Sequence, residues 1–379
     1  MTTPELEVVG LARTFAQNEL VPHAAEWDAG KVYPAEVMRK LGELGFFGLR
    51  VPEEYDGLAL DHETYLMVLE EIAAGDASVA ISLSVHNSLP VTMLAAHGTP
   101  EQKERWLRPM ARGNVLAAFS LSEADAGTDA SSLRAQATRA GDEWVLTGEK
   151  AWVTNGDVAD LYVVMARTDT PEDRRRHRGI SAFLVPAGTP GVTPGRREDK
   201  LGLRASSTTT LALHDVRLGR EGLLGEENLG FIYAMQALDA GRLGVAAQAV
   251  GIARAALEHA VRYAGERKQF ERPIGEFQAV QFMLADMATR IAAARELTLQ
   301  VARERQRGDR VTQRASMAKL FASETAMWVT TQAVQVFGGY GYMRDYPVER
   351  LFRDAKVTEI YEGTSEAQRI VIARGLHSD

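Results

Sequence analysis

The pattern of apolar residues changes twice along this chain of 379 residues, and these two changes limit its possible folds more than any other feature. Residues 1–115 and residues 226–379 show helical periodicity, whereas residues 116–225 form short β-rich runs separated by turns. In the last part, steps of three and four residues mark one face of a helix: Phe277, Val280, Leu284, Met287 and Ile291. We therefore predict an α+β fold with an N-terminal helical domain (1–115), a middle, mostly antiparallel β domain (116–225) and a C-terminal helical domain (226–379).

Composition excludes several classes of protein. The formal net charge is −8, which argues against nucleic-acid binding because that requires a basic face. The absence of cysteine excludes disulfide frameworks, thiolate nucleophiles and metal sites built on sulfur. The longest stretch without Asp, Glu, Lys or Arg, residues 77–100, contains Asn87, Pro90 and four serines, so we interpret it as a buried helix and not as a membrane span. The first residues show no signal-peptide pattern, and we expect a cytoplasmic protein.

Common cofactor, metal and hydrolase signatures are absent from the sequence. No G-x-G-x-x-G, G-x-x-x-x-G-K-[ST] or G-x-S-x-G occurs, and no two histidines have metal-ligand spacing. The mostly basic run at 174–178 lies in a polar loop and is interpreted as a solvated turn, with a patch for an anion or a partner as the alternative.

Two segments of the β region carry hydroxyl groups beside turns. Ser122 and Thr128 lie in the glycine-containing segment 119–129, which is either a plain loop or a cradle for an anion or a polar ring. Trp152 and Thr154 precede an Asn-Gly turn. Their strand could cover a flat aromatic ligand, but a core tryptophan before a hairpin turn is an equally good interpretation.

Two segments of the C-terminal region combine helix ends with aromatic residues or glycines. Segment 266–278 places Arg267 at a predicted helix end, where it could bind a phosphate or complement the helix dipole. Segment 335–342 contains Gly338, Gly339 and Gly341, which end a helix and allow a close approach of the backbone.

The last segment contains an acidic residue in front of a predicted helix start. Ser365 and Gln368 have capping-box spacing, which predicts that a helix begins there. Glu362 precedes this cap and follows two apolar residues. Burial in such surroundings would raise the pKa of its carboxyl group and make it a proton acceptor near neutral pH, although a structural or idle role is also open.

Together with segments 200–207 and 238–242, these five segments follow the order and approximate spacing of the acyl-CoA dehydrogenases, and the chain resembles that family over essentially its whole length. The resemblance implies a C-terminal four-helix bundle, a bound FAD, an acyl-CoA substrate that is oxidised to the trans-2-enoyl-CoA, and a homotetramer. It also implies that electrons pass to an electron-transfer flavoprotein. An acyl-CoA oxidase that uses O₂ and a non-catalytic binding protein on the same fold are the alternatives.

The resemblance further implies roles for single residues. Glu362 matches the catalytic base, and Gly241 stands where some relatives place that base and cannot serve. Ala80 stands where glutaryl-specific relatives carry an arginine, which disfavours a dicarboxylyl substrate. Residues expected to contact the FAD are Phe119, Leu121, Ser122, Gly127, Thr128, Trp152, Val153, Thr154, Arg267, Phe270, Phe277, Gln278, Gln335, Val336, Gly338, Gly339, Thr364 and Glu366. Residues expected to contact the substrate are Thr128, Leu238, Asp239, Arg242, Tyr361 and Gly363, and no metal ligand is expected.

Overall fold

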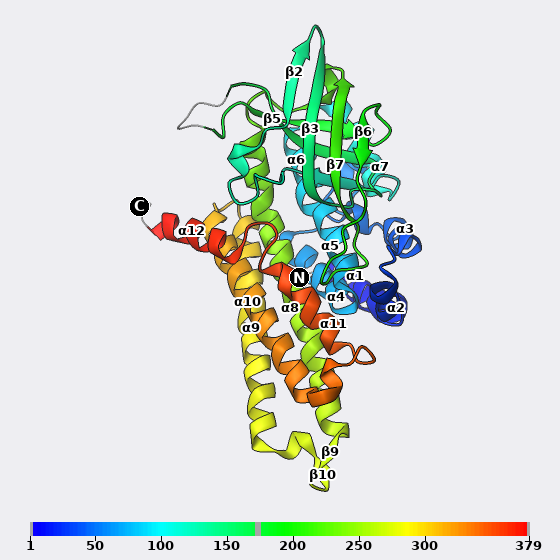
Figure 1. Ribbon diagram of the computed structural model, residues 1–379, viewed down its shortest axis with the longest axis vertical. Coiled ribbons are helices and arrows are strands. Elements are labelled where there is room, and N and C mark those ends of the chain that lie inside the picture. Colours follow the sequence, from blue (N-terminus) through cyan, green and yellow to red (C-terminus); the bar gives the residue numbers. More distant parts are fainter. Residues whose placement is uncertain (1–2, 171–175, 377–379) are drawn as a thin grey trace.

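A β region lies between two helical regions in the computed structural model, which describes residues 3–170 and 176–376 (Figure 1). Helix gives way to strand between Ala111 and Ala117, and strand gives way to helix between Leu224 and Gly230. The predicted α+β organisation is therefore confirmed. Of the basic run at 174–178, Arg174 and Arg175 lie outside the described residues.

The N-terminal region is a cluster of helices around α4 and α5. Aspartates cap both helices, because Asp61 accepts a hydrogen bond from the backbone N–H of Thr64 and Asp76 accepts one from Val79. The helices are α1 (Thr3–Phe15), α2 (Ala24–Gly30), α3 (Ala35–Glu43), α4 (His62–Gly75), α5 (Ala77–His86), α6 (Thr92–His97) and α7 (Pro100–Ala111), with the π-helical turns η1 (Ala16–Leu20) and η4 (Asn87–Val91).

The segment from α5 through η4 to α6 forms one long apolar helical stretch. By length and composition alone, Ala77–His97 could cross a membrane, but 83% of its most apolar window is buried inside the fold. His86 and Asn87 are completely buried and bond to the backbone carbonyls of Phe47 and Phe46. Polar side chains that are satisfied by protein groups indicate a core helix, as predicted.

The β region is one eight-stranded sheet. Its strand order is β6-β7-β3-β2-β4-β5-β8, with β1 paired to β4. Only the β1–β4 and β2–β4 pairs are parallel, so the sheet is mostly antiparallel, as predicted. The strands are β1 (Ala117–Ser120), β2 (Gln136–Ala140), β3 (Glu143–Thr154), β4 (Leu161–Arg167), β5 (Ile180–Pro186), β6 (Val192–Pro194), β7 (Thr208–Leu218) and β8 (Leu223–Leu224).

The C-terminal region is the predicted four-helix bundle, in which α8, α9, α10 and α11 pack together and α12 lies across one side (Figure 1). Its small residues allow the close approach that the sequence indicates: a Cβ at Gly251 of α8 would overlap the backbone of α4 at Glu70. The elements are α8 (Gly230–Glu266), β9 (Lys268–Gln269), β10 (Arg272–Pro273), α9 (Gln278–Gln306), α10 (Thr312–Phe337), α11 (Val348–Thr358) and α12 (Ser365–Leu376).

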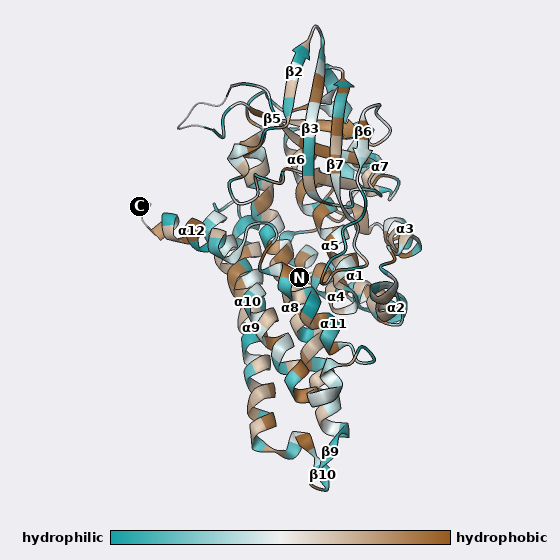
Figure 2. Ribbon diagram, viewed as in Figure 1, coloured by the Kyte–Doolittle hydropathy of each residue, from teal (hydrophilic) through white to brown (hydrophobic). Residues whose placement is uncertain are grey.

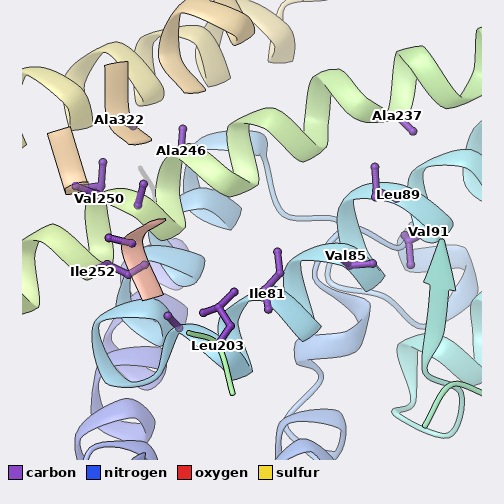
Figure 3. Close-up of a cluster of buried hydrophobic side chains, with 14 of the residues drawn as sticks. Ile81, Val85, Leu89, Val91, Leu203, Ala237, Ala246, Val250, Ile252 and Ala322 are labelled. Carbon is purple, nitrogen blue, oxygen red and sulfur yellow. The ribbon is translucent and has the colours of Figure 1, made fainter. Parts of the chain in front are cut away.

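The core joins α5 and η4 to the long helix α8. Figure 3 shows Ile81, Val85 and Leu89 beside α8, which contributes Ala237, Ala246 and Val250 to the same buried cluster. Apolar burial of this kind stabilises the fold by about 25 cal/mol for each Å² removed from water. By contrast, the β9–β10 hairpin at the far end of the bundle is hydrophilic (Figure 2).

A buried ion pair joins the two β segments that the sequence analysis singled out. Lys150 of β3 is completely buried, and its Nζ donates to Glu123 Oε1 at 2.7 Å and to the carbonyl of Leu121 at 3.1 Å. The Glu123 carboxylate also accepts hydrogen bonds from the backbone N–H groups of Arg134 and Ala135. Because burial outweighs the attraction of Glu123, the pKa of Lys150 falls to about 8.

We expect Lys150→Met to lower the free energy of unfolding by about 3–5 kcal/mol, because the change leaves the Glu123 carboxylate buried without its cation. Denaturant titration followed by circular dichroism measures this loss. Lys40→Met is the matched control, because its exposed pair with Glu19 should contribute nothing measurable. Equal stabilities of the two variants would contradict the structural role of Lys150.

Candidate functional site

Glu362 lies in a strained loop between α11 and α12. Glu362 and Gly363 both have left-handed backbone conformations, with φ of 50° and 94°. Lys319 Nζ donates to the carbonyl of Gly363 at 2.8 Å, and Gln368 Nε2 donates to the carbonyls of Glu362 at 3.1 Å and Gly363 at 2.9 Å. A non-glycine residue persists in this conformation only where its surroundings enforce it, so we infer that these contacts hold the loop in place.

The Glu362 carboxyl group is buried without a hydrogen-bond partner. Both of its oxygens are shielded from solvent and unpaired, and burial raises the pKa of the group to about 7. The cations of Lys319 and Arg242 oppose this effect and keep the pKa from rising further. The carboxyl group therefore changes charge near neutral pH, as a general base requires.

Gly241 of α8 makes room for this carboxyl group. A Cβ at Gly241 would overlap Glu362 Oε2, and the Leu89 side chain lies on the other side of the same space. The glycine thus supplies volume where any other residue would displace the carboxylate.

The segments around Ser122 and Trp152 lie side by side. The backbone N–H of Ala151 donates to the carbonyl of Ser122 at 2.9 Å, next to the Lys150–Glu123 pair. Trp152 has a φ of 60° at an irregularity in the β3–β7 pairing, and 66% of its surface is exposed. A large exposed ring in a strained conformation beside hydroxyl groups is better suited to covering a flat ligand than to core packing. Leu121 and Val153 are buried, Phe119 and Thr154 are half-buried, and Gly127 and Thr128 are exposed.

Helix α5 connects these strands to the Glu362 loop. Asn155, directly after β3, donates from Nδ2 to the carbonyl of Ser82 in α5 at 3.1 Å. Two residues farther along α5, Ser84 packs against Gly244, one turn of α8 beyond Gly241. Phe119 and Tyr361 also pack against one common buried cluster. The exposed tryptophan and the buried carboxyl group are therefore anchored to one rigid core.

The residues around Arg267 and the glycine-rich helix end form a separate hollow of about 630 Å³ at the far end of the bundle. The Arg267 guanidinium lies 5.5 Å from the centre of the Tyr340 ring, while the Tyr263 and Phe337 rings stack at 4.0 Å. Phe270 and Phe277 meet edge to face beside it, with ring centres 6.0 Å apart. The residues that line the hollow are Tyr263, Arg267, Gln269, Ile274, Val336, Phe337, Gly338, Gly339, Tyr340 and Met343.

This hollow is far from Glu362 within one chain. Glu266, before Arg267, lies 25 residues after Gly241 on α8, which is about 38 Å at 1.5 Å per residue. Gln278 and Gln335 are exposed near the hollow and do not line it. The residues that the sequence predicts to contact the FAD thus fall into two groups. One lies in the β region and the Glu362 loop, and the other lies around Arg267 at the far end of the bundle.

Asp239 and Arg242, two predicted substrate contacts, are bonded to each other. Arg242 Nη1 donates to Asp239 Oδ1 at 2.7 Å, and the hydroxyl group of Thr312 donates to Asp239 Oδ2 at 2.7 Å. Arg242 Nε is buried without a partner. Leu238, next to Asp239, is half-buried. The pair positions a cation close to Glu362, and its contact with a substrate stays a prediction.

The predicted helix start after Glu362 is confirmed, but the predicted capping box is wrong. The cap is Thr364, whose Oγ1 accepts a hydrogen bond from the backbone N–H of Ala367 at 3.2 Å. The hydroxyl group of Ser365 is buried without a partner, and Gln368 bonds to the Glu362 loop instead of to the cap. Glu366 is exposed in the first turn of α12.

Sequence reasoning missed Lys319, although its signal was present. It is a single lysine within an alanine-rich stretch of α10, and it is completely buried in the fold. Burial lowers its pKa to about 8. Residues 3–170 and 176–376 contain no cluster of three or more His, Asp or Glu that could hold a metal ion.

Comparisons with known proteins agree along the whole chain. Models of the N-terminal, middle and C-terminal domains of acyl-CoA dehydrogenase match residues 2–114, 118–216 and 228–377. The chain is 48% identical to the mitochondrial short-chain specific acyl-CoA dehydrogenase of Rattus norvegicus over 361 residues, which are 95% of this chain and 87% of that protein.

Solved structures show the same likeness. Butyryl-CoA dehydrogenase from Megasphaera elsdenii superposes with a TM-score of 0.97 at 44% identity, covering 100% of this chain and 99% of that chain. A chain solved in work on the electron transferring flavoprotein of Acidaminococcus fermentans also gives a TM-score of 0.97, at 46% identity and with the same coverage.

We expect Lys319→Met to raise the pKa of Glu362 further above 7, because the change removes the largest electrostatic effect that opposes burial. Infrared difference titration of the carboxyl C=O band, with Glu362→Gln as the blank, measures this pKa. An unchanged titration midpoint in a folded Lys319→Met protein would contradict the electrostatic role of Lys319.

Proposed function

The chain belongs to the acyl-CoA dehydrogenase family, and we propose from that premise that it oxidises a short-chain acyl-CoA to the trans-2-enoyl-CoA with Glu362 as the base. The observation that carries the assignment of the base is the unpaired, buried Glu362 carboxyl group, which has a raised pKa and faces the space left by Gly241. The names of its relatives, short-chain specific acyl-CoA dehydrogenase and butyryl-CoA dehydrogenase, support a short acyl group.

The residues of the β region fit the flavin of the FAD that the family uses. The exposed Trp152 ring offers a flat apolar surface, and Ser122 and Thr154 lie on the adjoining segments as hydroxyl donors. We propose that these residues hold the isoalloxazine ring and that the hollow around Arg267 holds the adenosine diphosphate half. When bound, FAD supplies the acceptor for the hydride that leaves the β-carbon.

The chain itself supplies the acid–base part of the reaction. The α-proton of a thioester is weakly acidic, so the thioester carbonyl must be polarised by a fixed donor before a carboxylate can remove that proton. In the described part of the chain, the backbone N–H of Glu362 has no acceptor and is free to bind the carbonyl oxygen. Since the Glu362 carboxyl group lies on the same residue, proton removal and carbonyl polarisation are positioned by one strained loop.

The separation of the two predicted FAD-binding groups supports a homo-oligomer. Gly241, beside Glu362, and Glu266, next to Arg267, lie about 38 Å apart along α8, so the Glu362 loop with Thr364 and the hollow around Arg267 are at different ends of the bundle in one chain. We propose that a second copy supplies the hollow around Arg267, within the homotetramer that the family resemblance implies. Large exposed apolar side chains on the bundle, such as Phe282 and Val261, support a contact between copies.

An electron-transfer flavoprotein is the proposed electron acceptor. The likeness to a chain solved in work on the electron transferring flavoprotein of Acidaminococcus fermentans supports it. The cytoplasmic location stays a prediction.

We expect Glu362→Gln to retain yellow FAD but to lose reduction of that flavin by butyryl-CoA, by at least about 10³-fold, because the amide cannot accept the α-proton. Anaerobic bleaching of the flavin absorbance measures the rate, and oxygen consumption by the wild type distinguishes an oxidase. Bleaching of the variant at a near-wild-type rate would rule out Glu362 as the base.

We expect Arg267→Ala to weaken FAD retention, and mixed oligomers of Arg267→Ala and Glu362→Gln chains to regain activity. In a mixed oligomer, a site can combine Glu362 of the Arg267→Ala chain with Arg267 of the neighbouring Glu362→Gln chain. Co-expression with two affinity tags isolates the mixed species for assay without added FAD. Inactive mixed oligomers would mean that Arg267 and Glu362 of one site belong to the same chain.

A further inference from the structure

A small polar cavity lies beside α8, the helix that also carries Gly241. It has a volume of about 10 Å³, which is the space of roughly one water molecule. Helices α4, α6 and α8, the turn η4 and the segment around Arg50 enclose it, and its lining residues are Arg50, His62, Tyr65, Leu66, Asn87, Ser88, Thr92, Ala240 and Leu243.

The cavity shares its walls with the Glu362 site. Ala240 is the neighbour of Gly241 on α8, and Leu243 follows Gly241 by two residues. Ser88 precedes Leu89, whose side chain borders the space beside Gly241. Tyr65 lies within electrostatic reach of both Glu362 and Arg50, and burial raises the pKa of its hydroxyl group. An acyl chain that is bound beside Glu362 and directed toward Tyr65 would reach this cavity.

Arg50 closes the cavity with a charge that lacks a carboxylate partner. Its guanidinium donates to the carbonyl of Leu60 and lies 3.2 Å from His62 Nε2. Burial and the neighbouring cations of Arg50 and Arg305 lower the pKa of His62 to about 2, so the imidazole is neutral. Neither Arg50 nor Arg305 forms an ion pair within residues 3–170 and 176–376.

The charged Arg50 guanidinium makes the end of the cavity unfavourable for the terminal methyl group of an acyl chain. A longer alkyl chain would fill the cavity beside the guanidinium and the unpaired Asn87 Oδ1 and would offer neither group a hydrogen bond. A short chain leaves room for that water.

We propose that Arg50 is a specificity-determining residue that ends the acyl cavity with a polar wall and so limits the substrate to short acyl chains. The proposal rests on the proposed function, because it needs an acyl-CoA to enter beside Glu362. It assigns the chain-length preference to the loop before α4, which lies outside the segments that carry the family resemblance.

The test compares Arg50→Leu with Arg50→Lys as the charge-retaining control. For each protein, kcat/KM is measured with butyryl-, hexanoyl- and octanoyl-CoA. We expect Arg50→Leu to raise the hexanoyl-to-butyryl ratio about tenfold, since one or two methylenes in an apolar pocket are worth that much discrimination. Arg50→Lys should keep the wild-type ratio.

Binding gives a second readout that needs no turnover. Calorimetric titration with 2-butenoyl-CoA and 2-hexenoyl-CoA should show tighter binding of the longer ligand to Arg50→Leu only. If Arg50→Leu fails to fold, Arg50→Met replaces it, because it removes the charge and the polar end while it keeps an unbranched side chain.

The outcomes separate the two proposals. An unchanged ratio in a folded, active Arg50→Leu protein overturns the role of Arg50 and leaves the proposed function intact. Faster oxidation of glutaryl-CoA than of butyryl-CoA by the wild type overturns the end-wall role, because Arg50 would then bind a substrate carboxylate. A wild-type protein that oxidises no acyl-CoA overturns both.

Discussion

The cost of burying an unpaired carboxylate governs the C-terminal part of this structure. Glu362 has no hydrogen-bond partner for either oxygen, and removing such a charge from water is expensive. The neighbouring groups limit that cost without cancelling it: Lys319 and Arg242 supply positive charge from two helices, but neither bonds to the carboxylate. The two cations therefore act on the Glu362 carboxyl group only through their charge. Their hydrogen bonds go elsewhere, from Lys319 to the carbonyl of Gly363 and from Arg242 to Asp239.

The sequence was sufficient to predict the order of the three regions, and the roles assigned to its five segments stay predictions. These features depend on local periodicity and on residue types at fixed spacing, which are visible without a structure. The partners of buried charges were not predictable in the same way. Lys319 and Gly363, or Lys150 and Glu123, are distant in sequence, and only the packing of α10 and of the β segments brings them together.

The error at the start of α12 has a similar origin. Thr364 and Ser365 can both cap a helix, and the spacing to Gln368 favours Ser365. In the structure Gln368 instead bonds to the strained Glu362 loop, so the capping role passes to Thr364. The small cavity at Arg50 was equally hidden, because its lining residues come from four separate parts of the chain.

Gly241 has a further consequence for how this fold diversifies. The Glu362 carboxylate occupies the space that a Cβ at position 241 would need, so a larger residue at 241 must shift this side chain. A side chain at 241 would therefore change the direction in which the Glu362 carboxyl group points, without any change at residue 362 itself. The two positions are therefore coupled, and the substitutions that one of them tolerates depend on the residue at the other.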